Sequence, residues 1–419
     1  MKVLQINNFH YVRGGSDKVY LETINLLKDA GHEVYSFSSE DERNLYSRYS
    51  DYFVKKQNLK GELSLKNKLD SGISFIYNFE AIKKLKLLLK DYRPDIAHLH
   101  IFQSRLSSAI VKVFKDFDIP VVMTVHEYKM LCPAYTFLDK ESEICETCAR
   151  SRNYLHAIKK KCIDNSYLKS TLSASESFIR DSFFSYIEHI DHFIMVSKFI
   201  FDKHAQYEKK YLDKSSVLYN FIDFEKLSFF EKDIFKKGDY MLYLGRLSKE
   251  KGLNTLIQAF ENLSSIKLKI VGDGNMKPQL EEYVKNKQIR NIDFLGFKHS
   301  EEVLDLISKA SFIIVPSEWY ENNPMTVIEA MAMGKPVIGA DIGGIPELIR
   351  NGENGYLFES RNVKELAQLI NHCNNLNDNS YNKLSENSMK FAKSNFSSTN
   401  YIRDLEKIYL NVIETKGRK

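Results

Sequence analysis

Short apolar runs alternate with longer amphipathic stretches along the first half of this chain. The runs have the length of buried strands, and the stretches between them place apolar residues at helical spacing. One such stretch, 18–31, ends at Gly31, which suits the position just after a helix. The strands are expected at 2–7, 32–38, 94–100, 120–128 and 192–198. Continuous apolar strands alternating with amphipathic helices predict a parallel, doubly wound sheet.

The same pattern restarts after a boundary near 215–227. A strand and a loop occupy 239–252, a helix follows at 253–263, and a last helix is expected over 401–414. The further strands are expected at 268–274, 292–297, 311–317, 335–341 and 355–358. We therefore predict two similar α/β domains facing a central cleft, with ligands at the carboxyl ends of the strands.

The 419 residues suffice for two or three domains, and no apolar run is long enough to cross a bilayer. The start, MKVLQINNFH, is typical of a strand and not of a signal peptide, so we expect a cytoplasmic protein. Residues 1–219 carry 33 Lys and Arg against 28 Asp and Glu, and residues 220–419 carry 27 of each. The basic excess could attract an anionic membrane or a phosphorylated substrate, or lie in water without a partner.

The stretch SEWYENNPMTVIEAMAMGKPVIG, residues 317–339, holds the sharpest candidate chemistry. Asn323 can cap a helix whose first residue is Pro324, and the free N–H groups that follow, at Met325, Thr326 and Val327, favour an anion. Glu321 precedes this helix and Glu329 lies about one and a half turns into it. A buried Glu329 needs donors, which ribose or sugar hydroxyls could supply. The alternative is that Glu329 pairs with a lysine or an amide while Glu321 is solvated.

Other strand ends carry further candidates. Arg246 and Lys251, in the loop YLGRLSKEKG, could converge on one diphosphate, although ordinary charged loops look similar. Gly14 and Gly15 follow the first strand and leave room for a ligand against the backbone. His126 ends a central strand, where a ligand site and a structural histidine are equally compatible with the pattern.

Four of the five cysteines are clustered, with the spacing C-x12-C-x2-C-x13-C. Cys132, Cys145, Cys148 and Cys162 are compatible with a tetrahedral structural zinc site inside an insertion. Four unpaired thiols and an iron–sulfur cluster are the alternatives. A separate basic stretch, 64–90, is either a helix packed on the sheet or a membrane-surface helix.

In combination these motifs resemble family 4 glycosyltransferases of the GT-B fold. The resemblance covers nearly the whole chain and includes GGSDKV, PDIAHLH, TVHEY, YLGRLSKEKG and GGIPELIRNGENGYLF. Its most specific part is the pair Glu321 and Glu329, which looks like the E-x7-E motif of retaining enzymes. Two departures are Asp17, where glutamate is usual, and Phe221, where glycine is common.

The resemblance implies an enzyme that moves a sugar, with retention, from a nucleotide diphosphate sugar (UDP- or GDP-linked) to a hydroxyl of a glycan or lipid-linked acceptor. Residues 1–215 would bind the acceptor and carry the insertion at about 128–170. Residues 216–395 would bind the donor, and 396–419 would form a helix crossing back to the first domain. The setting would be capsule, exopolysaccharide or lipopolysaccharide biosynthesis, in the cytoplasm or on the inner membrane face, with no nucleic acid and no catalytic metal.

Residue roles follow from the same resemblance. Arg246 and Lys251 would hold the diphosphate, which Gly14 and Gly15 would border. Glu329 would hold the ribose hydroxyls. Glu321, Asn323, Pro324, Met325 and Thr326 would contact the sugar and phosphates, with His126 near the sugar and acceptor. The competing hypotheses are a GT-B nucleotide-sugar epimerase and a non-catalytic subunit of a glycan assembly complex.

Overall fold

The structure is a computed structural model that describes residues 1–56, 65–230 and 235–417. The chain divides into two compact units. The first comprises Met1–Leu218 and Tyr401–Lys419, and the second comprises Tyr219–Asn400. Within the described ranges, no helix has the length and apolar character needed to span a bilayer.

The first unit is built on a six-stranded parallel sheet in the order β2-β1-β3-β4-β5-β6. Its strands are β1 (Lys2–Ile6), β2 (Glu33–Phe37), β3 (Ile96–Leu99), β4 (Val121–Val125), β5 (His192–Met195) and β6 (Ser215–Val217). Its helices are α1 (Gly15–Asp29), α2 (Leu65–Ile76), α3 (Phe79–Asp91), α4 (Val111–Asp116), α5 (Thr147–Ser151), α6 (Leu155–Lys159), α7 (Tyr167–Phe183), α8 (Tyr186–His189), α9 (Lys198–Tyr207) and α10 (Lys210–Asp213), with short 3-10 turns at Ser50–Tyr52 and Ser108–Ile110.

The second unit repeats this plan in the order β12-β11-β10-β7-β8-β9. Its strands are β7 (Tyr240–Leu244), β8 (Lys267–Val271), β9 (Ile292–Gly296), β10 (Ile313–Val315), β11 (Val337–Ala340) and β12 (Gly355–Phe358). Its helices are α11 (Leu253–Phe260), α12 (Lys277–Asn286), α13 (Ser300–Ser308), α14 (Met325–Ala332), α15 (Ile345–Leu348), α16 (Val363–Asn374) and α17 (Asp378–Asn395), with 3-10 turns η3 (Glu225–Phe230) and η4 (Lys249–Lys251). The predicted doubly wound parallel sheets are confirmed.

The strand orders place the candidate loops. In the second unit β7 lies between β8 and β10, so the chain reverses direction across the sheet at the β7–β10 pair. In the first unit the reversal lies at β1 and β3. Ligands of open α/β sheets bind beyond the carboxyl ends of the strands at such reversals.

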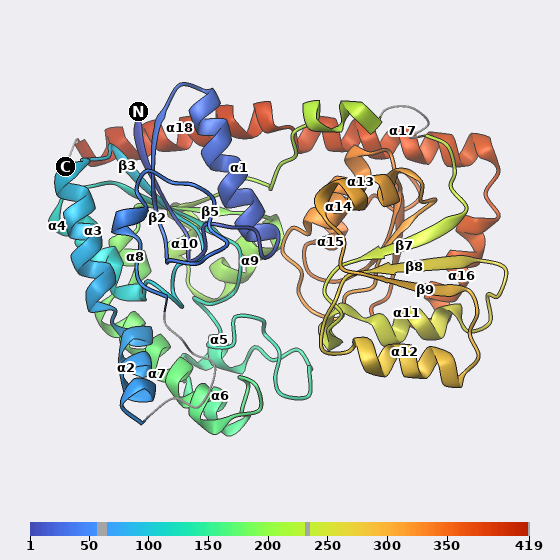
Figure 1. The fold of residues 1–419 in the computed structure, drawn as a ribbon, viewed down its shortest axis with the longest axis horizontal. Helices are drawn as coiled ribbons and strands as arrows, with labels where there is room; N and C mark the ends of the chain where they lie inside the picture. The colour runs from blue at the N-terminus through green and yellow to red at the C-terminus, as the bar shows by residue number, and fades with distance from the viewer. Residues whose placement is uncertain (57–64, 231–234, 418–419) are drawn as a thin grey trace. The chain divides into compact units, whose positions relative to one another are not determined.

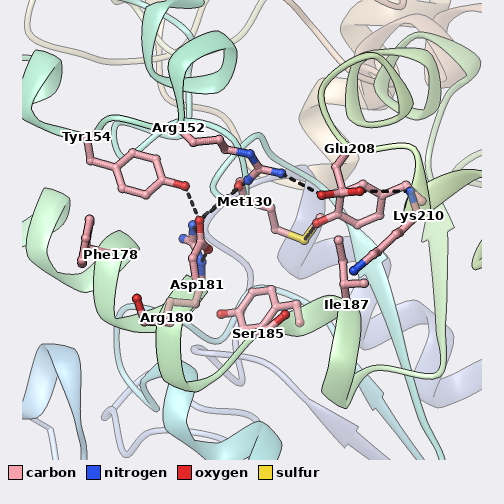
Figure 2. Close-up of a pocket in the computed structure, with 13 residues that line it drawn as sticks. Met130, Arg152, Tyr154, Phe178, Arg180, Asp181, Ser185, Ile187, Glu208 and Lys210 are labelled. Atoms are coloured by element: carbon pink, nitrogen blue, oxygen red, sulfur yellow. Dashed lines mark hydrogen bonds and ion pairs between the residues drawn. The ribbon is translucent and has the colours of Figure 1, made fainter.

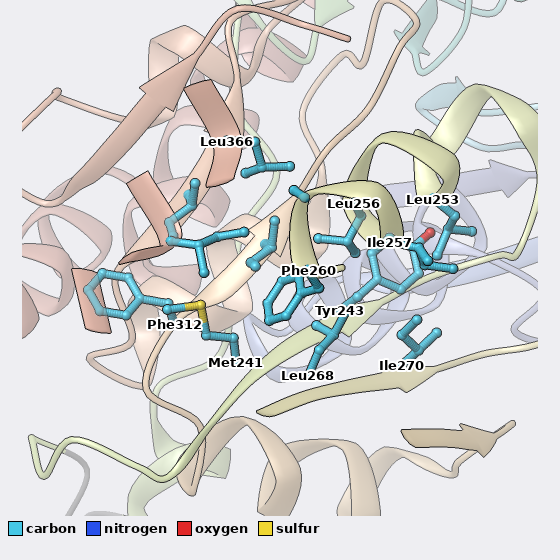
Figure 3. Packing of buried hydrophobic residues seen from close by; sticks show 14 of the residues in the cluster. Met241, Tyr243, Leu253, Leu256, Ile257, Phe260, Leu268, Ile270, Phe312 and Leu366 are labelled. Atoms are coloured by element: carbon cyan, nitrogen blue, oxygen red, sulfur yellow. The ribbon is translucent and has the colours of Figure 1, made fainter. Parts of the chain in front are cut away.

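The core of the second unit shows why its elements form. Met241 and Tyr243 of β7 point into the same layer as Leu256 and Phe260 of α11, and all four are at most 3% exposed (Figure 3). Figure 1 shows α11 and α12 on one side of this sheet and α13 and α14 on the other. Because both faces are covered, the strands are apolar on both faces, which is the continuous pattern seen in the sequence.

Two sequence predictions require correction here. The basic stretch 64–90 is not one helix, because α2 ends at Ile76 and Asn78 caps α3 by accepting a hydrogen bond from the amide of Ala81 at 3.0 Å. Residue 64 lies outside the described residues. The boundary region 215–227 also contains a strand, β6. The sequence pattern missed it because the strand has only three residues, two of which are serines.

The last helix, α18 (Ser398–Gly417), belongs to the first unit from Tyr401 onward. Tyr401 approaches Thr23 at 3.4 Å, and Glu406 pairs with His32 at 2.7 Å. Its buried face, which includes Leu405 and Tyr409, packs into that unit. The chain therefore returns to its first unit after completing the second.

Candidate functional site

Two loops of the second unit meet through a partly buried ion pair. Lys251 ends η4 in the loop after β7, and Glu321 lies in the loop after β10, the neighbouring strand. The Nζ of Lys251 donates to Oε1 of Glu321 at 2.6 Å, and the hydroxyl of Ser317 donates to the same oxygen at 2.8 Å. Glu321 is 7% exposed. Burial raises the pKa of its carboxyl, but the lysine and the hydrogen bonds outweigh burial and lower it.

Arg246 is held differently from Lys251, although both lie in one loop. Its guanidinium donates to Glu250 at 2.7 Å and to Ser248 at 3.2 Å, and its side chain is 63% exposed. The hydroxyl of Tyr243 donates to the carbonyl of Arg246 at 2.9 Å. Arg246 is thus an exposed cation on a fixed backbone, while Lys251 is a partly buried one.

The start of α14 differs from the prediction. The helix begins at Met325, with Pro324 at the N-cap, so Pro324 is not the first helical residue and Asn323 does not cap the helix. Asn323 Oδ1 instead accepts the amide of Asn220 at 2.9 Å. The amide of Val327 is also used, because it donates to the carbonyl of Pro324 at 3.0 Å. The first helical turn therefore offers the amides of Met325 and Thr326 alone.

A buried donor beside this helix has no hydrogen-bond partner. Asn323 is 6% exposed, and its Nδ2 finds no hydrogen-bond acceptor among the residues that the structure describes. Burying an amide N–H without an acceptor costs about 1–3 kcal/mol. Such a donor indicates a place where a ligand oxygen would be stabilised.

Two glycines hold the Glu321 loop from the other side. Gly343 has φ +63°, and a Cβ there would lie 2.4 Å from the carbonyl oxygen of Glu321. A Cβ on Gly344 would lie 1.9 Å from the carbonyl oxygen of Asn322, and the Gly344 amide donates to the Glu321 carbonyl at 2.6 Å. The GGIPE sequence therefore fixes the backbone of Glu321, a role that its residues alone did not reveal.

Glu329 lies in the middle of α14, whose neighbours Ile328 and Ala330 are buried. Its side chain is partly exposed, so it is not sealed in the core. This placement keeps it on the same helix as the Met325 and Thr326 amides. Whether it serves ribose, as the sequence predicted, stays a prediction.

In the first unit, the loop after β1 carries the predicted glycines. Gly14 is extended at the N-cap of α1, and Gly15 is the first helical residue. Asp17 is 6% exposed and accepts from the side chain of Asn7 at 2.9 Å and from the amide of Arg13 at 3.3 Å. Asp17 therefore ties this loop to the end of β1, which gives it a structural role that the sequence left open.

His126 follows β4 and ends a buried chain of hydrogen bonds. Gln5 Oε1 accepts from Nε2 of His100 at 3.0 Å, which leaves His100 Nδ1 without a proton. That nitrogen accepts from Nε2 of His126, also at 3.0 Å, so Nδ1 of His126 is an acceptor. Burial lowers the pKa of His126 to about 3, so the ring is neutral at pH 7.

The other end of this chain comes from α18. Tyr409 donates to Nδ1 of His98 at 2.6 Å, and Gln5 Nε2 approaches both Tyr409 at 3.1 Å and His98 at 3.2 Å. His98 Nε2 then donates to Thr124 at 2.7 Å. The sequence analysis singled out His126 alone. The residues of the hydrogen-bonded chain behind it, such as Gln5 and Tyr409, are 404 positions apart in the sequence and come together only in the fold.

Glu127, next to His126, is a carboxyl group whose surroundings disfavour its ionised form. Burial raises its pKa to about 7, and nearby Glu176 and Asp17 add to the rise while Lys129 opposes it. Because the folded pKa is above the unfolded value of 4.5, ionisation of Glu127 destabilises the fold as the pH rises from 4.5 to 7.

We expect Glu127→Gln to remove this pH dependence. At pH 8 the variant should be more stable than the native chain by up to about 3 kcal/mol, and at pH 4 the two should be equal. Urea unfolding at both pH values measures the difference. Equal stabilities at pH 8 would show that Glu127 does not ionise at a raised pKa in the fold.

Figure 2 shows one cavity of the first unit, with a volume of about 310 Å³, and none of the candidate residues lines it. Several of its polar groups pair with each other: Arg152 reaches Asp181 at 3.7 Å and Glu208 at 3.6 Å, and Tyr154 donates to Asp181. These contacts attach the cysteine-bearing insertion to α7 and to the end of α9. The residues that line this cavity therefore hold the insertion against the rest of the first unit. Among the described residues, no three His, Cys, Asp or Glu side chains lie so as to hold a metal ion, so the structure does not bring the four cysteines of the predicted zinc site together as ligands.

Solved structures share the fold over the whole chain. A glycosyltransferase from Rickettsia africae aligns over 98% of both chains with a TM-score of 0.67 and 19% identity. Anabaena HepE, solved in complex with UDP and glucose, aligns over 97% of this chain and 99% of its own with a TM-score of 0.65 and 17% identity. The fold is thus the GT-B fold of glycosyltransferases.

Proteins of similar sequence are also glycosyltransferases. An uncharacterized glycosyltransferase of Methanocaldococcus jannaschii is 32% identical over 52% of this chain and 59% of its own length. The lipopolysaccharide 1,2-N-acetylglucosaminetransferase of Salmonella typhimurium is 32% identical over 42% of this chain and 49% of its own. The matched part spans about half the length of these curated relatives.

Family models cover both units. The model described as Glycosyltransferase Family 4 matches residues 13–226, and the one described as Glycosyl transferases group 1 matches residues 224–391. The chain belongs to glycosyltransferase family 4, and its second unit is that of the group 1 glycosyltransferases.

Proposed function

We propose that this protein transfers a sugar, with retention of anomeric configuration, from a nucleotide diphosphate sugar to a hydroxyl of a glycan or lipid-linked acceptor. The observation that carries the proposal is the Lys251–Glu321 pair, which joins the loops of two adjacent strands where the sheet reverses. A cation and a carboxylate at this place match the two halves of such a donor, a diphosphate and a hydroxyl-rich sugar.

The positions of further residues near the Lys251–Glu321 pair suggest how the nucleotide sugar would be bound. Arg246 would bind the diphosphate as an exposed cation, and the Met325 and Thr326 amides would receive a phosphate oxygen at the start of α14. The unpartnered Nδ2 of Asn323 would donate to the same ligand. Glu329, further along α14, would accept the ribose hydroxyls.

The first unit would supply the acceptor side. His126, whose Nδ1 can only accept, would take a hydrogen bond from a sugar hydroxyl and would not act as a general acid. Gly14 and Gly15 would admit the donor phosphates against the backbone at the start of α1.

The reaction would break the bond between the anomeric carbon and the diphosphate oxygen, and form a bond from that carbon to the acceptor oxygen on the same face. The acceptor proton would pass to the departing phosphate, whose negative charge Arg246, Lys251 and the α14 amides would stabilise. These groups bind the leaving diphosphate more strongly as charge develops, which is how they would lower the barrier.

The setting we propose is polysaccharide biosynthesis in the cytoplasm, with contact to the inner membrane face. Helix α3 supports the contact, because Phe79 and Leu87 are 69% and 45% exposed beside the exposed Lys83 and Lys90. UDP is the favoured nucleotide of the donor, since Anabaena HepE was solved with UDP; GDP is the other candidate.

A panel of UDP- and GDP-sugars tests the function. Each is incubated with the protein, alone and with glycan acceptors, and release of nucleoside diphosphate is followed together with the anomeric configuration of the product. We expect one donor to release diphosphate, and we expect Glu329→Ala to lose at least about 100-fold of this rate with unchanged thermal stability. The exposed Glu353→Ala serves as the matched control, with native activity.

Other outcomes separate the competing functions. An isomerised donor in the absence of acceptor would indicate an epimerase. Failure to bind any nucleotide diphosphate would indicate a non-catalytic subunit. An inverted product would overturn retention while leaving the transferase proposal intact.

A further inference from the structure

A row of polar side chains crosses the apolar interior of the first unit. Gln5 of β1 lies beside His98 of β3 in the strand register, and His98 Nε2 lies 2.7 Å from the hydroxyl of Thr124 on β4. His100 follows His98 by two positions, so it faces the same side of the sheet, and the two ring centroids are 4.3 Å apart. All four side chains are at most 2% exposed. Polar groups are costly to bury, so such a row must be held together by hydrogen bonds.

The row continues to the last helix and to the predicted site residue His126. The hydroxyl of Tyr409, on α18, lies 2.6 Å from Nδ1 of His98 and 3.1 Å from Nε2 of Gln5. At the other end, His100 Nδ1 lies 3.0 Å from Nε2 of His126. The bonds therefore run in one line through Thr124, His98, Tyr409, Gln5, His100 and His126.

Each histidine in this line passes on the direction of its hydrogen bonds. Burial lowers the pKa of His98 and His126 to about 3 and that of His100 well below its ordinary value, so the three rings are uncharged at pH 7. An uncharged imidazole has one N–H and one bare nitrogen. A ring that donates from one nitrogen must accept at the other, so the line has two consistent settings, which run in opposite directions.

Gln5 selects between the two settings. In the structure its Oε1 faces His100 Nε2 at 3.0 Å, so the proton of His100 lies on Nε2 and that of His126 lies on its own Nε2. If the Gln5 amide were turned over, its NH₂ group would donate to His100, and the proton of His126 would move to Nδ1. Nδ1 of His126 is thus an acceptor in one setting and a donor in the other.

Tyr409 and His98 favour the first setting. The NH₂ group of Gln5 has two hydrogens, and it lies beside two acceptors, the Tyr409 oxygen at 3.1 Å and Nδ1 of His98 at 3.2 Å. In the reversed setting this group would face only His100, and one N–H would be buried without an acceptor. An unpaired buried donor is costly, so the amide keeps the orientation that uses both of its hydrogens.

We propose that Gln5 and Tyr409 are positioning residues that act through His100 and keep the proton of His126 on Nε2. Nδ1 of His126 then presents a bare nitrogen to a hydroxyl group, such as a sugar in transfer would offer. The benefit for transfer rests on the proposed function, whereas the position of the proton does not. The last helix thereby acts on a site residue of its own unit without touching substrate.

Nitrogen NMR of the full chain carrying nitrogen-15 labelled histidine, recorded without substrate, tests the proposal. The spectrum shows which ring nitrogen carries the proton, and the His126 signals are identified by their loss in His126→Gln. We expect the native His126 ring to be protonated at Nε2. In Gln5→Met, His100 loses its acceptor and donates to His126 instead, so the ratio of the two His126 tautomers should shift toward the Nδ1–H form at least about fivefold.

Two conservative variants of α18 provide a matched pair. Tyr409→Phe removes one of the two acceptors of the Gln5 NH₂ group and should shift the ratio in the same direction at least about twofold. Tyr401→Phe removes the hydroxyl of another buried tyrosine of this helix, which approaches Thr23 at 3.4 Å, and should keep the native ratio. If Gln5→Met does not fold, Tyr409→Phe decides alone. A native ring protonated at Nδ1, an unchanged ratio in the folded variants, or an equal shift in Tyr401→Phe would overturn the proposal.

Kinetics distinguish this proposal from the proposed function. We expect kcat for transfer to fall about fivefold or more in Gln5→Met and about twofold in Tyr409→Phe, and to keep its native value in Tyr401→Phe. A tautomer shift in a protein that transfers no sugar would support the positioning role and remove the proposed function. Sugar transfer by the native chain with no tautomer shift in the variants would do the reverse.

Discussion

Lys251→Ala should abolish sugar transfer and destabilise the protein. Glu321 is 7% exposed, so without Lys251 its negative charge stays buried and unpaired. Of the two side chains that donate to Oε1, only the Ser317 hydroxyl remains. Removing one partner of a buried ion pair costs about 3–5 kcal/mol, because the other charge stays out of water. Transfer should fall at least about 1,000-fold if the same lysine neutralises the leaving diphosphate.

A double variant separates the two effects. In Lys251→Ala with Glu321→Gln the unpaired charge is gone, so most of the lost stability should return while transfer stays absent. Urea unfolding and the rate of diphosphate release measure the two quantities. Recovered activity in the double variant would show that Lys251 serves the fold and not the reaction.

The pH dependence gives the sign of the stability effect. The folded pKa of Glu321 is below its ordinary value of 4.5, so the pair stabilises the fold above that pH and loses its contribution as the pH falls through the folded pKa. The Lys251→Ala penalty should therefore be largest at pH 7 and should shrink below about pH 4.5. A penalty independent of pH would contradict the ion pair.

Arg246→Ala should abolish transfer without destabilising the protein. Its ion pair with Glu250 is exposed on the arginine side, and exposed pairs of this helical spacing contribute about 0.3–0.5 kcal/mol. A diphosphate held by two cations loses half of its countercharge when this side chain is removed, so we expect transfer to fall about 100-fold or more.

The matched control is Arg350→Ala, another exposed arginine of the second unit that pairs with Glu353 at 3.7 Å. It should keep native activity and native stability. Arg246→Lys should restore part of the activity, because it keeps the charge and loses the planar fork of donors. An active Arg246→Ala enzyme would remove Arg246 from the donor site.

Local pattern predicted the regular parts of the fold well. The apolar strands, the α1 helix with Gly31 at φ +81° just beyond it, and the restart of the pattern in the second unit follow from periodicity and turn chemistry that neighbouring residues set. Local pattern misplaced Asn323, which matched the cap pattern but bonds with Asn220, a hundred residues earlier. A capping residue and a tertiary hydrogen bond compete for the same oxygen, and only the fold decides between them.

By itself, the sequence determined two doubly wound domains, the family, and the residue types available to contact a diphosphate and a sugar. These depend on short-range periodicity and on motif order, which are properties of the chain. The tertiary structure decided which of these residues pair: Lys251 with Glu321, Arg246 with Glu250, His126 with His100. Such pairings depend on strand order and burial, because a buried charge or ring nitrogen must find a partner wherever the fold brings one.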